Sequence, residues 1–190
     1  MRTFILLTYF LIGSSIYGLS AQEADSSVER VLVVFKTHLD IGYTDLSSRV
    51  ERHYIDTFIP KALAVAEELR AAGREERYVW TTGSWLIWAY LHQASPEQVR
   101  RLEEGIRQGD IVWNGMPYTE VINGPLFEGI LDLSEWLDRR YGKQTRGAKM
   151  TDVPGHTRSI VPLLSRAGIR FLHIGVNGAT PVPKVPELCR

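Results

Sequence analysis

The feature that most constrains this chain is an apolar run, Val31–Phe35, that ends abruptly in chemically capable polar residues. The run is rich in β-branched residues without polar alternation, which is the pattern of a strand covered on both faces in a parallel sheet. His38 and Asp40 follow two positions apart. In extended backbone such side chains project to the same side, so an imidazole and a carboxylate can converge on one ion. Gly42 then lets the chain turn.

A second segment of this kind, Thr151–Thr157, reads Thr-Asp-Val-Pro-Gly-His-Thr. It follows a short stretch, Ala148–Met150, that we interpret as a strand, and it precedes a helical pattern. In parallel α/β architectures the active site lies at the carboxyl ends of the strands. Both polar segments fall at such ends, so His38, Asp40 and Asp152 are candidates for one site.

The two motifs resemble the catalytic domain of glycoside hydrolase family 38, the α-mannosidases and their relatives. The resemblance rests on His-x-Asp after a first strand and Asp-x-x-Gly-His after a later one, and it covers about residues 31–176. It implies that His38, Asp40 and Asp152 bind one zinc ion, and that Asp152 is also the nucleophile of a retaining glycosidase. It also implies that a fourth zinc ligand and the acid/base carboxyl group come from beyond Arg190.

Three residues are candidates for contact with the sugar. Family members carry a Trp where Tyr43 stands, as the platform beneath the sugar, and a Phe near where Pro154 stands, so the metal site matches the family better than the sugar pocket does. Trp113 ends a predicted strand and has a flat apolar face that can stack on a sugar ring. His156, one turn past Asp152, can orient that carboxylate or bind substrate.

Strand and helix patterns alternate along the chain, which predicts an α/β fold with a parallel sheet. We expect an incomplete (β/α)7-type barrel with about five strands, at 31–35, 78–82, 111–113, 148–150 and 170–175. Between the second and third strands, Ser95 and Gln98 predict a helix start with a capping box, and Gly109 predicts its end. An open sheet exposes an edge where further strands would pair. Residues 31–190 are therefore expected to be the N-terminal part of a larger glycoside hydrolase domain.

Residues 1–21 have the pattern of a secretory signal peptide, with Arg2, an apolar stretch and small residues that end at Ala21. The apolar stretch is shorter than the roughly 20 residues that span a bilayer. We therefore expect an exported protein, periplasmic or extracellular, with 22–30 as a flexible lead-in and no membrane association after cleavage. Cys189 is the only cysteine, which excludes an internal disulfide.

Basic and acidic residues number 22 each, so the composition does not favour nucleic acid or an anionic membrane as partner, and we expect a glycan or glycoside. His53 and His92 lie in helical patterns and His173 lies in an apolar strand, so we interpret all three as structural. One alternative is a different zinc hydrolase on a similar barrel, of the polysaccharide deacetylase type, although the paired Asp residues and the His-x-x-x-His pattern of that class are missing. Another is an exported carbohydrate-binding fragment that lacks the catalytic parts.

Overall fold

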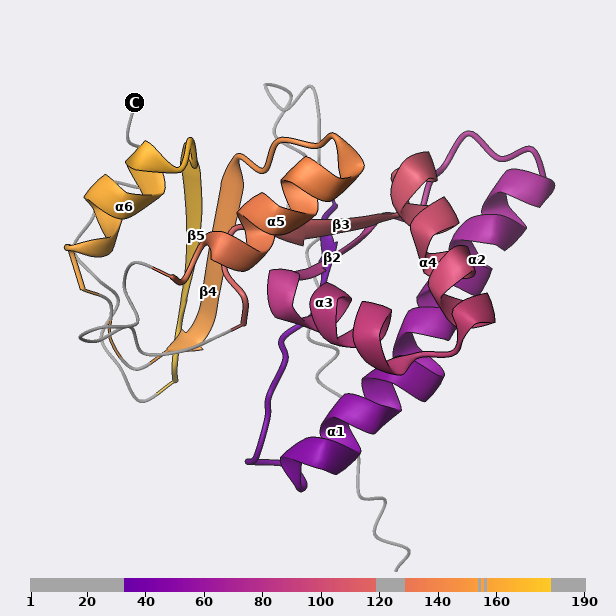
Figure 1. Ribbon diagram of the computed structural model, residues 1–190, viewed down its shortest axis with the longest axis horizontal. Helices are drawn as coiled ribbons and strands as arrows, with labels where there is room; N and C mark the ends of the chain where they lie inside the picture. The colour runs from indigo at the N-terminus through magenta and orange to yellow at the C-terminus, as the bar shows by residue number, and fades with distance from the viewer. Residues whose placement is uncertain (1–32, 119–128, 154, 156, 179–190) are drawn as a thin grey trace, which may run out of the picture. The chain divides into compact units, whose positions relative to one another are not determined.

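The computed structural model describes residues 33–118, 129–153, 155 and 157–178 of the chain. Parallel strands alternate with helices, so the fold is mixed α/β (Figure 1). The elements are β1 (Phe35–Lys36), α1 (Ser47–His53), the π-helix η1 (Tyr54–Phe58), α2 (Ile59–Ala71), β2 (Trp80–Gly83), α3 (Ser84–Gln93), α4 (Pro96–Gln108), β3 (Ile111–Asn114), α5 (Asp132–Tyr141), β4 (Gly147–Val153), α6 (Ile160–Arg166) and β5 (Phe171–Val176). The predicted signal peptide and lead-in lie outside the described residues.

All strand pairs are parallel. Three strands pair in the order β1-β2-β3, and β4 pairs with β5 (Figure 1). In the second pair Lys149 lies opposite His173. A backbone hydrogen bond from Gly115 N–H to Gly147 O, at 2.8 Å, links the end of β3 to the start of β4. Within the described ranges the strands do not close into a barrel.

Two hydrophobic cores hold the strands in place. The first packs η1, α2, α3 and α4 against β2 and β3, and its fully buried side chains include Ile55, Ile59, Leu63, Leu86, Ile87, Tyr90, Leu102, Ile106 and Ile111. The second packs α6 against β4 and comprises Met116, Ile130, Leu131, Ala148, Met150, Val153, Ile160, Leu164 and Ile169. Each large aliphatic side chain buried in this way contributes about 1.5–3 kcal/mol. The candidate site draws on both cores, because Leu39 belongs to the first and Val153 to the second.

Helix α4 begins and ends where the sequence predicts. The Ser95 hydroxyl accepts a hydrogen bond from Gln98 N–H, and the Gln98 side chain accepts one from Ser95 N–H, which completes the capping box. Gly109 ends the helix in the left-handed conformation, with φ at 77°. A residue without a Cβ adopts that conformation at little cost, so local chemistry alone specifies both ends.

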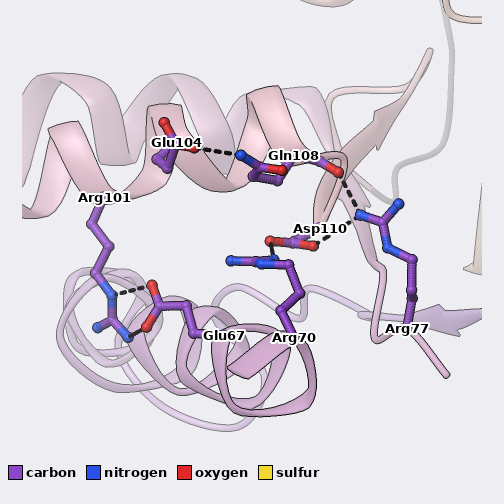
Figure 2. A network of polar contacts seen from close by, with 7 residues as sticks. All are labelled: Glu67, Arg70, Arg77, Arg101, Glu104, Gln108 and Asp110. Atoms are coloured by element: carbon purple, nitrogen blue, oxygen red, sulfur yellow. Dashed lines mark hydrogen bonds and ion pairs between the residues drawn. The ribbon is translucent and has the colours of Figure 1, made fainter. Parts of the chain in front are cut away.

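A network of ion pairs joins α4 to α2 and to the start of β3 (Figure 2). Arg101 donates to both carboxylate oxygens of Glu67, at 2.9 and 2.6 Å. Asp110, 2% exposed, accepts hydrogen bonds from Arg70 and Arg77. A carboxylate so deeply buried is stable only with such partners, so these arginines hold the turn before β3 in place.

The helical stretch between β1 and β2 is three consecutive segments, because the π-helix η1 lies between α1 and α2. Pro60 lies in the first turn of α2 and has no N–H to donate, and the wider turn of η1 directly before it accommodates the missing bond. The π-helix includes Tyr54, which is buried, and the Tyr54 hydroxyl lies 2.9 Å from Thr37 Oγ1. The irregular turn thus brings a polar contact to the end of β1.

The prediction that the first apolar run is covered on both faces is wrong for its described part. Val33, Val34 and Phe35 are 73%, 65% and 47% exposed, and β1 itself is only Phe35–Lys36. The physical reason is position, because β1 pairs with β2 on one side and, within the described residues, with no strand on the other.

In the part of the chain that the structure describes, none of the helices has the length and hydrophobicity of a membrane span.

Candidate functional site

The first half of the candidate site follows directly after β1. Thr37 N–H donates to Thr81 O at 3.1 Å, which extends the β1–β2 ladder by one residue. Leu39 is 7% exposed and packs in the first core, while His38 and Asp40 on either side of it line one cavity. The two polar side chains therefore border the same cavity, together with Leu39 and Ile41.

The second half of the site is an irregularity in β4. The register with β5 shifts between Met150 and Val153, and Asp152 lies inside this shift. Its φ is +60°, and among the described residues it is the only non-glycine residue with a positive φ. Aspartate tolerates this conformation better than most residues, yet at some cost in free energy. The bulge turns the Asp152 side chain out of the alternation of the strand, and 46% of it is exposed.

The bulge directs the Asp152 carboxylate toward His38. Asp152 Oδ2 lies 3.9 Å from His38 Nε2. The other carboxylate oxygen, Oδ1, accepts a hydrogen bond of 2.8 Å from Asn177 Nδ2. One carboxylate oxygen is therefore held by the amide of Asn177, and the other faces the imidazole of His38, which is far away in the sequence.

Sequence reasoning missed Asn177. It directly follows β5, at the carboxyl end of that strand. The rule that identified His38 and Asp152, which is to take the first polar residues after each strand, would also have found it.

His38 and Asp152 line a cavity of about 330 Å³ at the carboxyl ends of β1, β4 and β5. Its lining consists of His38, Leu39, Asp40, Ile41, Tyr43, Asp152 and Asn177. Tyr43 is 94% exposed, so its ring is open to a ligand from the solvent side. A cavity of this size, with two carboxylates, an imidazole, an amide and an aromatic ring, suits a polar ring such as a sugar.

A second cavity shares His38 and Asp40 with the first. Its lining also includes Asp45, which precedes α1, and residues of α1 and η1, among them His53. His53 stacks edge-on against Phe58, with ring centroids 4.4 Å apart, which agrees with a packing role for this histidine.

The donor set of the site suits zinc, since imidazole nitrogen and carboxylate oxygen are its usual protein ligands besides thiolate. Two ligands of a tetrahedral zinc ion lie about 3.4 Å apart, and His38 Nε2 and Asp152 Oδ2 are 3.9 Å apart. No group of three His, Cys, Asp or Glu side chains in the described ranges is close enough to hold a metal ion. The pair thus fits as two zinc ligands, and Asp40 lines the same cavity without closing on them.

Basic side chains lie on β1, β4 and β5, the strands that lead into the site. Lys149 on β4 is half-buried, and its Nζ donates to Thr37 O at 2.7 Å. Burial, with a smaller effect of Lys36, lowers the pKa of Lys149 to about 8. Burial also lowers the pKa of His173, with further effects of Lys36 and Lys149. His173 is exposed rather than in the core, contrary to the interpretation from sequence.

The structure does not bring Trp113, another sugar-contact candidate, to this cavity. Trp113 is 8% exposed and packs in the first core, where its Nε1–H donates to Asp138 Oδ1 at 3.0 Å. It faces Tyr141 of α5 rather than the paired residues. Its large aromatic surface is therefore used in packing between strand and helix. His156 and Pro154 lie outside the described residues.

No family model and no curated protein matches the sequence. Among solved structures, the chain is similar to the crystal structure of 4-alpha-glucanotransferase from Thermococcus litoralis, with a TM-score of 0.51 and 15% sequence identity. The similarity covers 73% of this chain and 21% of that chain. At this identity the similarity is one of fold, and our chain spans about a fifth of that protein's length. A glycoside-processing enzyme thus uses a fold of this type, while the resemblance to glycoside hydrolase family 38 rests on the two motifs.

Proposed function

We propose that this chain carries the zinc site and the nucleophile of a retaining glycoside hydrolase of α-mannosidase type, built on a (β/α)7-type barrel. One observation carries the proposal. Asp152 occupies a left-handed backbone conformation at a β-bulge, which directs its carboxylate toward His38 in a cavity at the strand ends. Strain of this kind on a chemically capable residue clusters at active sites.

Asp152 has the surroundings of a carboxylate nucleophile. Asn177 holds Oδ1 at 2.8 Å, so the carboxylate cannot rotate freely, and the side chain is open enough to meet a substrate. In a retaining mechanism such a carboxylate attacks the anomeric carbon and forms a glycosyl-enzyme intermediate. A second carboxyl group about 5 Å away protonates the leaving group and then activates water.

His38, Asp40 and Asp152 would hold the zinc ion. Bound there, zinc would act as a Lewis acid and as a template for sugar hydroxyl groups. The support for this part of the proposal is the donor set and the approach of His38 to Asp152. Asp40 would complete the set from the lining of the same cavity.

The substrate class follows from the lining of the cavity. The exposed ring of Tyr43 offers a face on which a sugar can stack, and His156 is proposed as a further substrate contact. The similar structure carries the name of a 4-alpha-glucanotransferase, which is also glycoside chemistry. We therefore propose a mannose-containing or related glycan as substrate, encountered outside the cytoplasm after signal cleavage.

The test is turnover of dinitrophenyl glycosides, with an α-mannoside first and other sugars alongside. These leaving groups depart without protonation, so the assay depends on the nucleophile rather than on the acid. Asp152→Asn keeps the shape and the backbone tolerance of aspartate but lacks the negative charge. We expect its turnover to fall about 1,000-fold or more.

The matched control is Asp56→Asn, an exposed aspartate of η1 that forms a long ion pair, of 4.0 Å, with Arg52. Its turnover should equal that of the parent. Substantial turnover by Asp152→Asn on every sugar that the parent cleaves would exclude Asp152 as the nucleophile. If the parent cleaves no glycoside but binds sugars, the carbohydrate-binding alternative holds instead.

A further inference from the structure

Lys149 makes a contact between two strands that are not neighbours in a sheet. Its Nζ donates to Thr37 O at 2.7 Å. Lys149 lies three residues before Asp152 on β4, and Thr37 directly precedes His38 after β1. This one hydrogen bond therefore joins the two chain segments that carry the two halves of the candidate site.

The contact requires a curled sheet. β1, β2 and β3 pair in that order, and Gly115 N–H links the end of β3 to Gly147 at the start of β4. At about 4.8 Å per strand spacing, a flat sheet would separate β1 from β4 by about 14 Å, roughly twice the reach of a lysine side chain. Lys149 therefore crosses the concave side of the curled strands, and the same curl brings His38 to Asp152.

Few backbone bonds fix the segment that Lys149 reaches. β1 has two residues, and in the described part of the chain no strand pairs with its far side. Thr37 is held by its N–H to Thr81 O, by its hydroxyl to Tyr54 and by its carbonyl to Lys149. The Tyr54 hydroxyl also donates to His38 O, at 3.4 Å. Side-chain hydrogen bonds thus hold this segment in place, because the two-residue strand makes few backbone hydrogen bonds.

The ammonium group of Lys149 is unfavourable where it lies. It is half-buried, and within the described residues no carboxylate lies within ion-pair distance of it. The titratable groups that face it, Lys36 on β1 and His173 on β5, supply no negative charge. Desolvating an unpaired ammonium opposes folding, so an apolar side chain would pack here at lower cost. What the ammonium adds is the bond to Thr37.

We propose that Lys149 is a positioning residue of the candidate site, whose bond to the Thr37 carbonyl sets the approach of His38 to Asp152. The inference takes the His38–Asp152 pair from the proposed function, and it can be tested whether or not that function holds. It assigns Lys149 no contact with substrate.

Zinc affinity gives a readout whose sign separates positioning from charge. Removing a positive charge near a cation site favours cation binding, so a purely electrostatic role predicts tighter zinc binding in Lys149→Met and in Lys36→Met alike. Positioning predicts weaker binding in Lys149→Met only, about 10- to 100-fold, as is usual when the support of a metal ligand is lost. Lys149→Arg keeps a donor and should recover most of the affinity. Zinc binding by Lys149→Met as tight as in the parent would overturn the proposal.

A second readout needs no metal. Hydrogen exchange of the zinc-free full chain, followed by mass spectrometry, reports the peptide 35–41. We expect Lys149→Met to exchange at least about tenfold faster there, and Lys36→Met to match the parent, with α4 protected in all three. Equal exchange in the three proteins would overturn the proposal, and so would faster exchange in α4 as well, since Lys149 would then act on the whole fold. If the parent binds no zinc, the zinc-dependent part of the proposed function is wrong. The role of Lys149 is then decided by the hydrogen-exchange experiment alone.

Discussion

The end of helix α4 and the end of strand β4 each have a residue in the left-handed conformation, and the two differ in how the sequence accounts for it. After α4 the residue is Gly109, with φ at 77°, where glycine is the usual helix end. In β4 it is Asp152, with φ at 60°, where a side chain makes the conformation costly. The helix follows local preference, and the strand departs from it at Asp152, the residue that we propose as the nucleophile.

The charges of the two regions differ in the same way. Around α4 the buried carboxylate of Asp110 has two arginine partners, Arg70 and Arg77 (Figure 2). On the concave side of the strands, half-buried Lys149 faces Lys36 and His173 and donates to a backbone carbonyl. The ion pairs of Asp110 stabilise the fold, whereas the half-buried ammonium of Lys149 opposes folding. Such a departure from local consistency indicates function rather than stability.

The largest expected effect on stability is at the paired carboxylate. Asp110→Ala removes the carboxylate that Arg70 and Arg77 share, and we expect the free energy of unfolding to fall by about 2 kcal/mol. Urea unfolding followed by circular dichroism measures it. The control is Glu97→Ala, which removes an ion pair to Arg100 whose side chains are 70% and 76% exposed, and this should change stability by less than about 1 kcal/mol. Equal losses in the two variants would mean that burial does not distinguish these ion pairs.

Substitution of each of the two left-handed residues tests the comparison further. Gly109→Ala places a Cβ at a positive φ and should cost about 1 kcal/mol. Asp152→Gly relieves the strain in β4 and should raise the free energy of unfolding by about 0.5–1 kcal/mol, while it removes the proposed nucleophile. The same unfolding experiment gives both values. If Asp152→Gly lost as much stability as Gly109→Ala, the strain at Asp152 would not be real.

A further expected effect is a pH dependence of stability. The folded chain lowers the pKa of Lys149 from 10.5 to about 8, chiefly by burial. Between these values the unfolded chain binds more protons, so the free energy of unfolding rises with pH through this window. Lys149→Met should lack that rise, and the measurement is the difference between the two proteins from pH 7.5 to 10.5. Parallel pH profiles would place Lys149 in solvent.

Local chemistry explains which parts of the fold the sequence predicts. The capping box at Ser95 and Gln98 and the glycine at 109 specify α4 from neighbouring residues alone, and both ends are confirmed. The π-helix at Tyr54–Phe58 and the exposure of β1 were not predicted. They depend on which elements pack beside them, and hydrophobic periodicity does not carry that information.

The candidate site divides in the same way. Spacing and the rule of strand ends predicted that His38, Asp40 and Asp152 lie at one edge, and all three line one cavity. The rule could not foresee that Trp113 packs toward α5, because either face of a strand can bear a large aromatic. The contact of Lys149 with Thr37 joins residues 112 positions apart and follows from sheet curl alone. Zinc, the acid/base residue and export stay predictions.

The central claim is that His38 and Asp152 act as one metal-binding pair, and elemental analysis after dialysis against zinc tests it most directly. The parent should retain about one zinc per chain, and His38→Ala and Asp152→Ala should each lose it. The control is His92→Ala, a histidine of α3 whose Nδ1 lies 2.7 Å from Trp88 O, and it should retain the metal. Equal zinc in His38→Ala and His92→Ala would contradict the account.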